Sequence, residues 1–208
     1  MTQQKHAADK LANVSNAQAR RSALRYIYIP AQNADDWAHL LADIQLLLAI
    51  PEHQVPLVGG SRPSQNDIWA LARASTGLVS IAVEGKVSEP FGPTLSEWLA
   101  EGSKGKASRL AFLRRELNLN EALAGTIRYQ LIHRTGSAVI EAKRFGAPHA
   151  VMIVHSFSPS REWFQDFEAF ALLLCAEVTV NRVVYVGQRG GVYLHIGWIC
   201  GNEEFLVK

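Results

Sequence analysis

The spacing of hydrophobic residues along the chain predicts an alternation of strands and helices. Residues 24–29 alternate like a short strand, which Pro30 ends. From residue 34 to residue 50, apolar side chains instead recur every three or four positions. This spacing predicts an amphipathic helix that Pro51 ends. The apolar stripe of that helix consists of Trp37, Leu40, Leu41, Ile44, Leu47 and Leu48.

Two strand-like runs follow, residues 67–73 and 78–87, and only residues 74–77 separate them. A connection this short, with a glycine in it, predicts a β-hairpin. Residues 149–157 are almost entirely apolar, which is typical of a central strand buried on both faces. Helices are predicted at 94–100, 107–117, 127–145 and 158–174. The last of them would have Ser158 as N-cap and Pro159 as first helical residue. A terminal hairpin is predicted from residues 178–186 and 192–199.

This order of elements predicts an α/β (α+β) fold, in which helices flank a central mixed sheet and a β-hairpin ends the chain. Residues 1–24 are expected to form a flexible or weakly helical arm, and residues 25–208 a single domain. The chain has no signal-peptide pattern and no run of about 18 apolar residues, the length that crosses a bilayer. We therefore expect a cytoplasmic protein without membrane contact.

Composition adds little to this picture. A formal net charge of +2 is too small to indicate nucleic-acid binding by itself, so a local basic patch would have to provide it. The two cysteines, Cys175 and Cys200, lack the paired spacing of metal ligands and are expected to be small buried hydrophobic residues.

The predicted hairpin carries the charged residues with the clearest chemistry. If Arg73 pairs with Leu78, counting back along both strands places Asp67 directly opposite Glu84, and Lys86 lies on the same face. Two carboxylates this close repel each other, and a divalent cation such as Mg²⁺ or Mn²⁺ would stabilise them. The alternative is a surface ion pair at the end of a strand.

Asp67 followed after 16 residues by Glu84-Gly85-Lys86, at the end of an apolar strand, resembles the PD-(D/E)XK nuclease superfamily. Restriction endonucleases and RecB-like exonucleases belong to it. The likeness covers roughly residues 25–175. Within the superfamily, this stretch resembles an uncharacterised bacterial family. Asn66 stands where the superfamily name has proline, and the acid that many members carry on the first helix has two candidates here, Asp43 and Glu52.

The resemblance implies a restriction-endonuclease-like fold and a Mg²⁺- or Mn²⁺-dependent nuclease that acts on DNA. Asp67 and Glu84 would be the metal ligands, and Lys86 would stabilise the attacking water or the transition state. Gln130 would be a further catalytic residue, because RecB-like members use a helix glutamine in that neighbourhood. Two alternatives stay open: a non-catalytic module that binds nucleic acid or protein, and a hydrolase of a small phosphorylated metabolite.

Several other groups allow both a structural and a functional interpretation. The polar stripe of helix 127–145 is either solvated or contacts a phosphate, and it comprises Gln130, His133, Arg134, Ser137 and Glu141. A basic cluster of Lys104, Lys106, Arg109, Arg114 and Arg115 is either a solvated helix face or a nucleic-acid contact; Lys106, Arg109 and Arg134 are the candidate binding residues. We expect core histidines at His149, His155 and His195, and a core or homodimer contact at Tyr185, Tyr193 and Trp198.

Overall fold

The computed structural model describes residues 43–120 and 122–201. Within these ranges a mixed six-stranded sheet has the strand order β1-β2-β3-β4-β6-β5. The first three strands form an antiparallel meander, β3, β4 and β6 run parallel, and β5 pairs antiparallel with β6. This arrangement confirms the predicted α+β class with a mixed sheet. The strands are β1 Gln45–Val55, β2 Ser64–Ala74, β3 Gly77–Lys86, β4 His149–Ser156, β5 Arg182–Arg189 and β6 Val192–Cys200.

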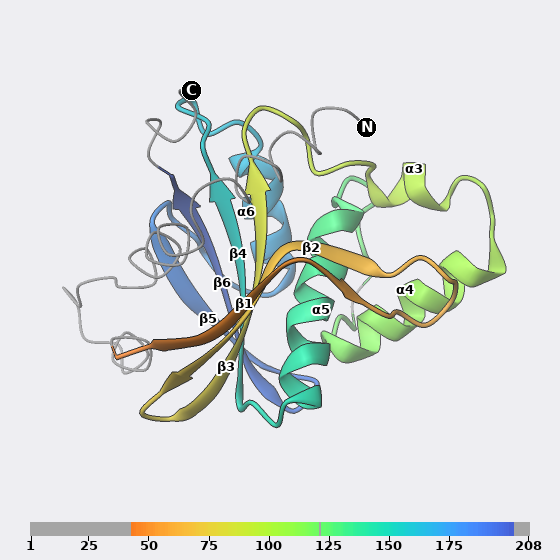
Figure 1. Ribbon diagram of the computed structural model, residues 1–208. Helices are drawn as coiled ribbons and strands as arrows, with labels where there is room; N and C mark the ends of the chain where they lie inside the picture. The colour runs from red at the N-terminus through yellow and green to blue at the C-terminus, as the bar shows by residue number, and fades with distance from the viewer. Residues whose placement is uncertain (1–42, 121, 202–208) are drawn as a thin grey trace.

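The longest described helix, α5, crosses one face of this sheet (Figure 1). Its apolar side packs on β3 and β4 in the larger hydrophobic core, where α6 residues also lie. A hydrogen-bonded chain fixes its position over the hairpin: the Trp69 indole donates to Ser80 Oγ at 3.0 Å, and Ser80 donates to the Ala138 carbonyl at 3.1 Å. The helices are α3 Leu95–Leu99, α4 Lys104–Glu116, α5 Tyr129–Arg144 and α6 Phe164–Leu173.

The predicted hairpin, the helices at 94–100, 107–117 and 127–145, and the buried strand at 149–157 are all confirmed within a few residues at their ends. Every residue of β4 is buried, as expected for a central strand. The last helix starts later than expected, at Phe164 rather than Ser158. Its predicted first turn is irregular because Arg161 and Trp163 adopt positive φ angles of 56° and 69°.

The helix predicted for residues 34–50 is wrong where the structure describes it, because residues 45–50 belong to strand β1. The preceding part of that helix, the strand at 24–29 and the arm 1–24 lie outside the described residues. Strand β1 forms an edge of the sheet, where Pro51 is tolerated because an edge residue does not need its N–H for a neighbouring strand. An unbroken apolar run such as Leu46-Leu47-Leu48 fits either kind of element.

The expectation that both cysteines are buried is also wrong. Cys175 is exposed and follows α6 in a left-handed turn with φ 62°, and Cys200 is partly exposed at the end of β6; both are free thiols. His149, His155 and His195 are buried, as expected, and Trp198 lies in the larger core. Among the helices that the structure describes, none has the length and apolar character needed to cross a membrane.

The loop between β1 and β2 packs directly against α4, and Arg109 holds it there. The Arg109 guanidinium donates to the carbonyls of Val58 at 3.2 Å and Gly60 at 3.1 Å. Gly59 has φ 87°, and a Cβ at this position would overlap the Gly105 carbonyl oxygen. The loop that leads into the acidic hairpin is therefore fixed both by the Arg109 side chain and by close contact between its backbone and that of α4.

We expect Gly59→Ala to lower the free energy of unfolding by about 2–4 kcal/mol, because the added methyl group combines left-handed strain with a clash against backbone. Urea denaturation measures the change. Gly102→Ala is the matched control, since Gly102 has φ 61° but open space around it. Its cost should stay near 1–2 kcal/mol, the order expected for left-handed strain alone. Equal losses in both variants would contradict the close packing of Gly59.

Candidate functional site

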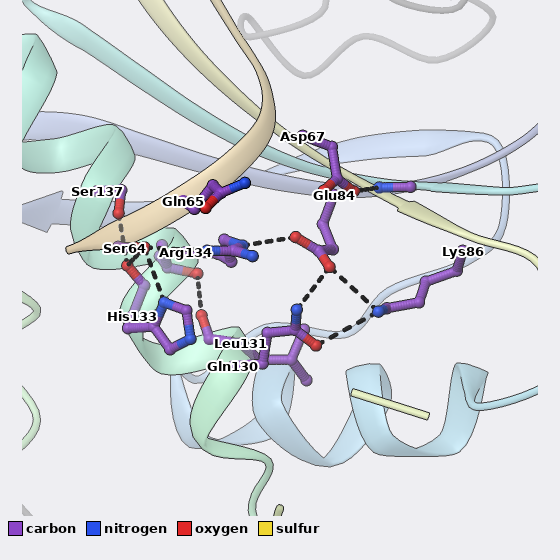
Figure 2. Close-up of polar contacts among 12 residues, drawn as sticks. Ser64, Gln65, Asp67, Glu84, Lys86, Gln130, Leu131, His133, Arg134 and Ser137 are labelled. Carbon is purple, nitrogen blue, oxygen red and sulfur yellow. Dashed lines mark hydrogen bonds and ion pairs between the residues drawn. The ribbon is translucent and has the colours of Figure 1, made fainter. Parts of the chain in front are cut away.

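Asp67 lies where the β2–β3 ladder ends. The observed pairs run from Ala74↔Gly77 to Ile68↔Val83, which confirms the predicted register. At the next position a side chain replaces the backbone carbonyl as acceptor: Asp67 Oδ2 accepts a hydrogen bond from the Gly85 N–H at 2.6 Å. The carboxylate is thereby held next to Glu84 (Figure 2).

Both carboxylate oxygens of Glu84 accept hydrogen bonds from helix α5 (Figure 2). Gln130 Nε2 donates to Oε1 at 2.6 Å, and Arg134 Nε donates to Oε2 at 2.5 Å. Gln130 and Arg134 are four residues apart, so they project from the same side of the helix. Glu84 itself is only 3% exposed, so its charge depends on these donors and on Lys86 for compensation.

Lys86 is one of the most deeply buried charged residues of the described chain, at 1% exposure. Its Nζ lies 3.1 Å from Glu84 Oε1 and donates to Gln130 Oε1 at 3.3 Å. The ammonium also lies 5.1 Å from the ring centre of Phe91, and Glu89 is 3.9 Å away. The strand spacing of two residues thus brings the glutamate and the lysine to one point, as the sequence predicted.

The polar stripe of α5 is buried rather than solvated, which corrects the structural interpretation of that stripe. Four of its five members are buried, and His133 is half-buried. The buried members are Gln130, Arg134, Ser137 and Glu141. The stripe therefore faces the acidic hairpin and the start of β2.

Ser64, the first residue of β2, is a site residue that the sequence analysis missed. Its Oγ accepts from Arg134 Nη1 at 3.2 Å and lies 2.7 Å from His133 Nδ1. A serine that follows Gly59, Gly60 and Pro63 looks like an ordinary loop residue in the sequence. Nothing in the local sequence distinguishes it, because both of its partners come from α5, about 70 positions further along.

Burial and charge move the proton affinities of the two acids in opposite directions. Burial raises the pKa of Asp67 to about 7, the negative charge of Glu84 adds to this, and Arg134 and the Gly85 N–H only partly oppose it. Burial would also raise the pKa of Glu84, but Arg134 and Lys86 outweigh it and hold that pKa below its usual range. Near neutral pH, Glu84 is therefore charged and Asp67 is close to its titration midpoint.

The predicted nucleic-acid-binding residues lie in three different environments. Arg134 is inside the site, paired with Glu84. Arg109 is buried, with its guanidinium bonded to the β1–β2 loop. Lys106 pairs with Glu101 at 2.6 Å, and its Nζ lies 5.6 Å from the ring centre of Trp98. The three residues do not form one surface stripe.

Neither candidate for a third acid joins Asp67 and Glu84. Asp43 accepts from the Ser75 N–H at 3.1 Å, at the turn of the hairpin, and the exposed Glu52 pairs with Gln65. A further buried acid, Glu141, lies 3.3 Å from His53 and 3.1 Å from Arg144. Within the described ranges, no three His, Cys, Asp or Glu residues are grouped to hold a metal ion.

The donor set still fits Mg²⁺ or Mn²⁺ in kind. These cations prefer carboxylate oxygens and are commonly held by one or two carboxylates together with water and substrate phosphates. Asp67 and Glu84 supply two such groups side by side, and a bound cation would offset the repulsion between their negative charges. Arg134 and Lys86 meet part of that need already, so a cation would compete with them for Glu84.

The fold and the site define an α+β protein with two carboxylates, a lysine and a glutamine converging at the end of a hairpin. The chain belongs to the family described as a domain of unknown function, DUF6946, whose family model matches residues 4–203. Comparison with curated proteins and comparison with solved structures gave no significant match.

Proposed function

We propose that the protein is a divalent-metal-dependent nuclease that hydrolyses phosphodiester bonds, with DNA as the expected substrate. The observation that carries the proposal is the meeting of Asp67 and Glu84 at the end of the hairpin, with Lys86 and Gln130 bonded to the same glutamate. Part of the order of elements supports it: the hairpin β2–β3, the long helix α5 and strand β4, which is parallel to β3, follow one another as the nuclease resemblance implies. The resemblance also implied a helix before the hairpin, and there residues 45–50 belong to strand β1 instead.

Asp67 and Glu84 would hold the cation, which when bound would polarise a phosphate and lower the pKa of a water molecule. The protein's own residues have distinct tasks around it. Gln130 bonds to both Glu84 and Lys86, so it fixes the orientation of each. Lys86 supplies a buried positive charge for the negative charge that develops on a phosphate oxygen. Burial of these groups keeps bulk water from weakening their interactions.

Metal binding and cleavage test the proposal. We expect millimolar Mn²⁺ to raise the melting temperature of the wild type by about 3–6 °C, the effect of a ligand well above its Kd on a domain of this size. Asp67→Asn and Glu84→Gln should abolish the shift. Glu141→Gln is the matched control, since it also alters a buried acid facing a strand, but one that contacts His53 and Arg144 instead.

Cleavage of labelled single- and double-stranded DNA and RNA should require Mn²⁺ or Mg²⁺. Lys86→Gln should reduce cleavage by about 100-fold or more, because an aligned charge is lost from the transition state, yet should keep the metal-induced melting shift. A wild type without any melting shift would rule out the metal site. Unchanged cleavage in Lys86→Gln would remove the lysine from the reaction.

One observation favours a second function, that of a non-catalytic module that binds nucleic acid or protein. Arg134, Lys86 and Gln130 together neutralise and satisfy Glu84 without a cation. A site of this kind could persist for structural reasons alone. Oligonucleotide binding without divalent-dependent cleavage would favour this function over the nuclease.

A further inference from the structure

The Ser64 hydroxyl connects two side chains of α5, and the contact distances favour one arrangement of donors and acceptors. Arginine has only donors, so the 3.2 Å contact uses the Ser64 oxygen as acceptor for Arg134. The single hydroxyl hydrogen is then free to donate. Its possible acceptors are His133 Nδ1 at 2.7 Å and the His133 carbonyl at 3.4 Å, and the shorter distance favours Nδ1. In the opposite arrangement Nδ1–H would donate to the second lone pair of the Ser64 oxygen and leave the hydroxyl only the longer contact. A hydroxyl that donates to Nδ1 requires this nitrogen to carry no hydrogen.

A neutral imidazole without a hydrogen on Nδ1 carries it on Nε2. In Figure 2, Nδ1 of His133 faces Ser64 and the other ring nitrogen points away from it. Within the described residues, Nε2 makes no hydrogen bond, and it is not a fully buried atom left without a partner. The arrangement favoured by these distances holds the ring and leaves one N–H donor on a half-buried side chain.

Packing holds the ring in this orientation. His133 lies against Tyr129, with ring centres 4.8 Å apart, and Tyr129 stacks on Trp98 at 3.7 Å with nearly parallel planes. His133 is three residues from Gln130, so the two side chains emerge one helical turn apart, about 5–6 Å between Cβ atoms. A ligand phosphate beside Gln130 and Lys86 would thus have a neighbouring donor at His133.

We propose that His133 is a substrate-binding residue, whose neutral Nε2–H donates to a backbone phosphate of a nucleic-acid strand, and that Ser64 and Arg134 position it. This inference rests on the proposed function for its ligand, but the tautomer and its support by Ser64 stand on the contacts alone. Positive neighbours favour the uncharged ring, since burial, Arg134, Arg109 and Lys86 hold the pKa of His133 well below its usual range.

The first test reads the tautomer directly. NMR spectroscopy of the full chain with ¹⁵N-labelled histidine, at pH 7, should show an unprotonated Nδ1 and a protonated Nε2 for His133, assigned through His133→Gln. Ser64→Ala should mix the two tautomers, and Ser64→Thr should preserve the original one because the hydroxyl remains. A protonated Nδ1 in the wild type would overturn the proposed positioning, whatever the protein does to DNA.

The second test measures binding of fluorescein-labelled DNA oligonucleotides by anisotropy in Ca²⁺ buffer, with their intactness checked on gels. His133→Phe keeps an aromatic ring against Tyr129 but removes the donor, and we expect about 5–10-fold weaker binding. His133→Gln offers an amide N–H near the Nε2 position and should bind within about twofold of the wild type. Ser64→Ala should fall between the two.

Salt dependence separates this neutral contact from a charged one. A neutral donor releases no counterion, so His133→Phe should leave the slope of log K against log salt unchanged. Lys106→Gln, the charged control on α4, should reduce that slope by about one if Lys106 contacts a phosphate.

The possible outcomes distinguish the role of His133 from the proposed nuclease function. Cleavage and binding by the wild type, together with unaltered binding by His133→Phe, would overturn the role of His133 and leave the nuclease intact. A changed salt slope in His133→Phe would show a charged imidazole and overturn the neutral donor. A wild type that neither binds nor cuts DNA would overturn the proposed function and its substrate contact together, while the NMR result would still decide the tautomer.

Discussion

Replacing Arg134 with methionine is expected to lower the free energy of unfolding by about 2–4 kcal/mol. Arg134 donates to Glu84 at 2.5 Å in a buried setting, and methionine removes the charge while keeping an unbranched side chain. Breaking a buried ion pair leaves an uncompensated charge, which typically costs about 3–5 kcal/mol. Lys86 and Gln130 remain bonded to Glu84, so we expect a value at or below this range.

A double-mutant cycle with Glu84→Gln identifies the cause of the loss. The double variant, Arg134→Met with Glu84→Gln, has no buried carboxylate at this position and should recover at least about 1 kcal/mol relative to Arg134→Met alone. Urea denaturation at pH 7 measures all four proteins. Lys106→Met is the matched control for an exposed ion pair, with Glu101, and should cost less than about 1 kcal/mol. Equal losses in Arg134→Met and Lys106→Met would mean that Glu84 does not depend on Arg134.

The register of the acidic hairpin could be predicted because two local rules determine it. Side chains alternate between the faces of a strand, and a short connection fixes which residues meet. The prediction took residues 74–77 as the connection, whereas Ala74 and Gly77 already pair and only residues 75 and 76 form the turn. Removing one residue from each end of the connection leaves every pairing unchanged, so Asp67 still arrives beside Glu84.

The error at strand β1 has a different origin. The apolar residues between Ile44 and Ile50 satisfy a helical spacing, but they are also a nearly continuous apolar run. Such a run fits a strand just as well, and pairing with β2 decides the outcome. Three of these side chains, Leu47, Leu48 and Ile50, remain about two-fifths exposed at the edge of the sheet. Burial of apolar surface therefore does not explain why this segment is a strand rather than a helix.

The composition of the site could be predicted only where its residues are neighbours along the chain. Glu84 and Lys86 are two positions apart, and Gln130 and Arg134 share one side of a helix, so local periodicity finds both pairs. The contact between the two pairs joins residues 46 and 50 positions apart. Ser64 lies still further from its partners. Tertiary packing creates these contacts, and no local pattern encodes them.

Asp67→Asn is expected to stabilise the protein above neutral pH when no divalent cation is present. Asparagine keeps a side-chain oxygen for the Gly85 N–H but cannot ionise, so it avoids a second negative charge beside Glu84. We expect a gain of about 1–3 kcal/mol at pH 8, since a tenfold change in proton affinity corresponds to about 1.4 kcal/mol and the partial exposure of Asp67 reduces the full effect.

The sign of the pH dependence follows from the raised pKa of Asp67, about 7 in the folded protein against a usual value of 3.8. Between these values the folded protein holds a proton that the unfolded chain has lost. The wild type therefore loses stability as pH rises through this range, and the loss is complete near about pH 8, roughly one unit above the folded pKa. The difference between Asp67→Asn and the wild type should be small near pH 4 and level off near pH 8. Urea denaturation in EDTA at pH 4.5, 6 and 8 measures it.

Adding Mn²⁺ at pH 8 should reverse the order of the two proteins. The cation would stabilise the wild type, in which the ionised Asp67 and Glu84 can both bind it, and would leave Asp67→Asn unchanged. At pH 5 the same Mn²⁺ concentration should have much less effect, because the proton on Asp67 competes with the cation. A variant that is stabler in EDTA but fails to respond to Mn²⁺ would show that the wild type retains an unfavourable pair of acids for the sake of cation binding. If Asp67→Asn instead destabilises the protein at pH 8, Asp67 acts mainly as a structural cap for the end of strand β3, and the metal proposal loses its main support.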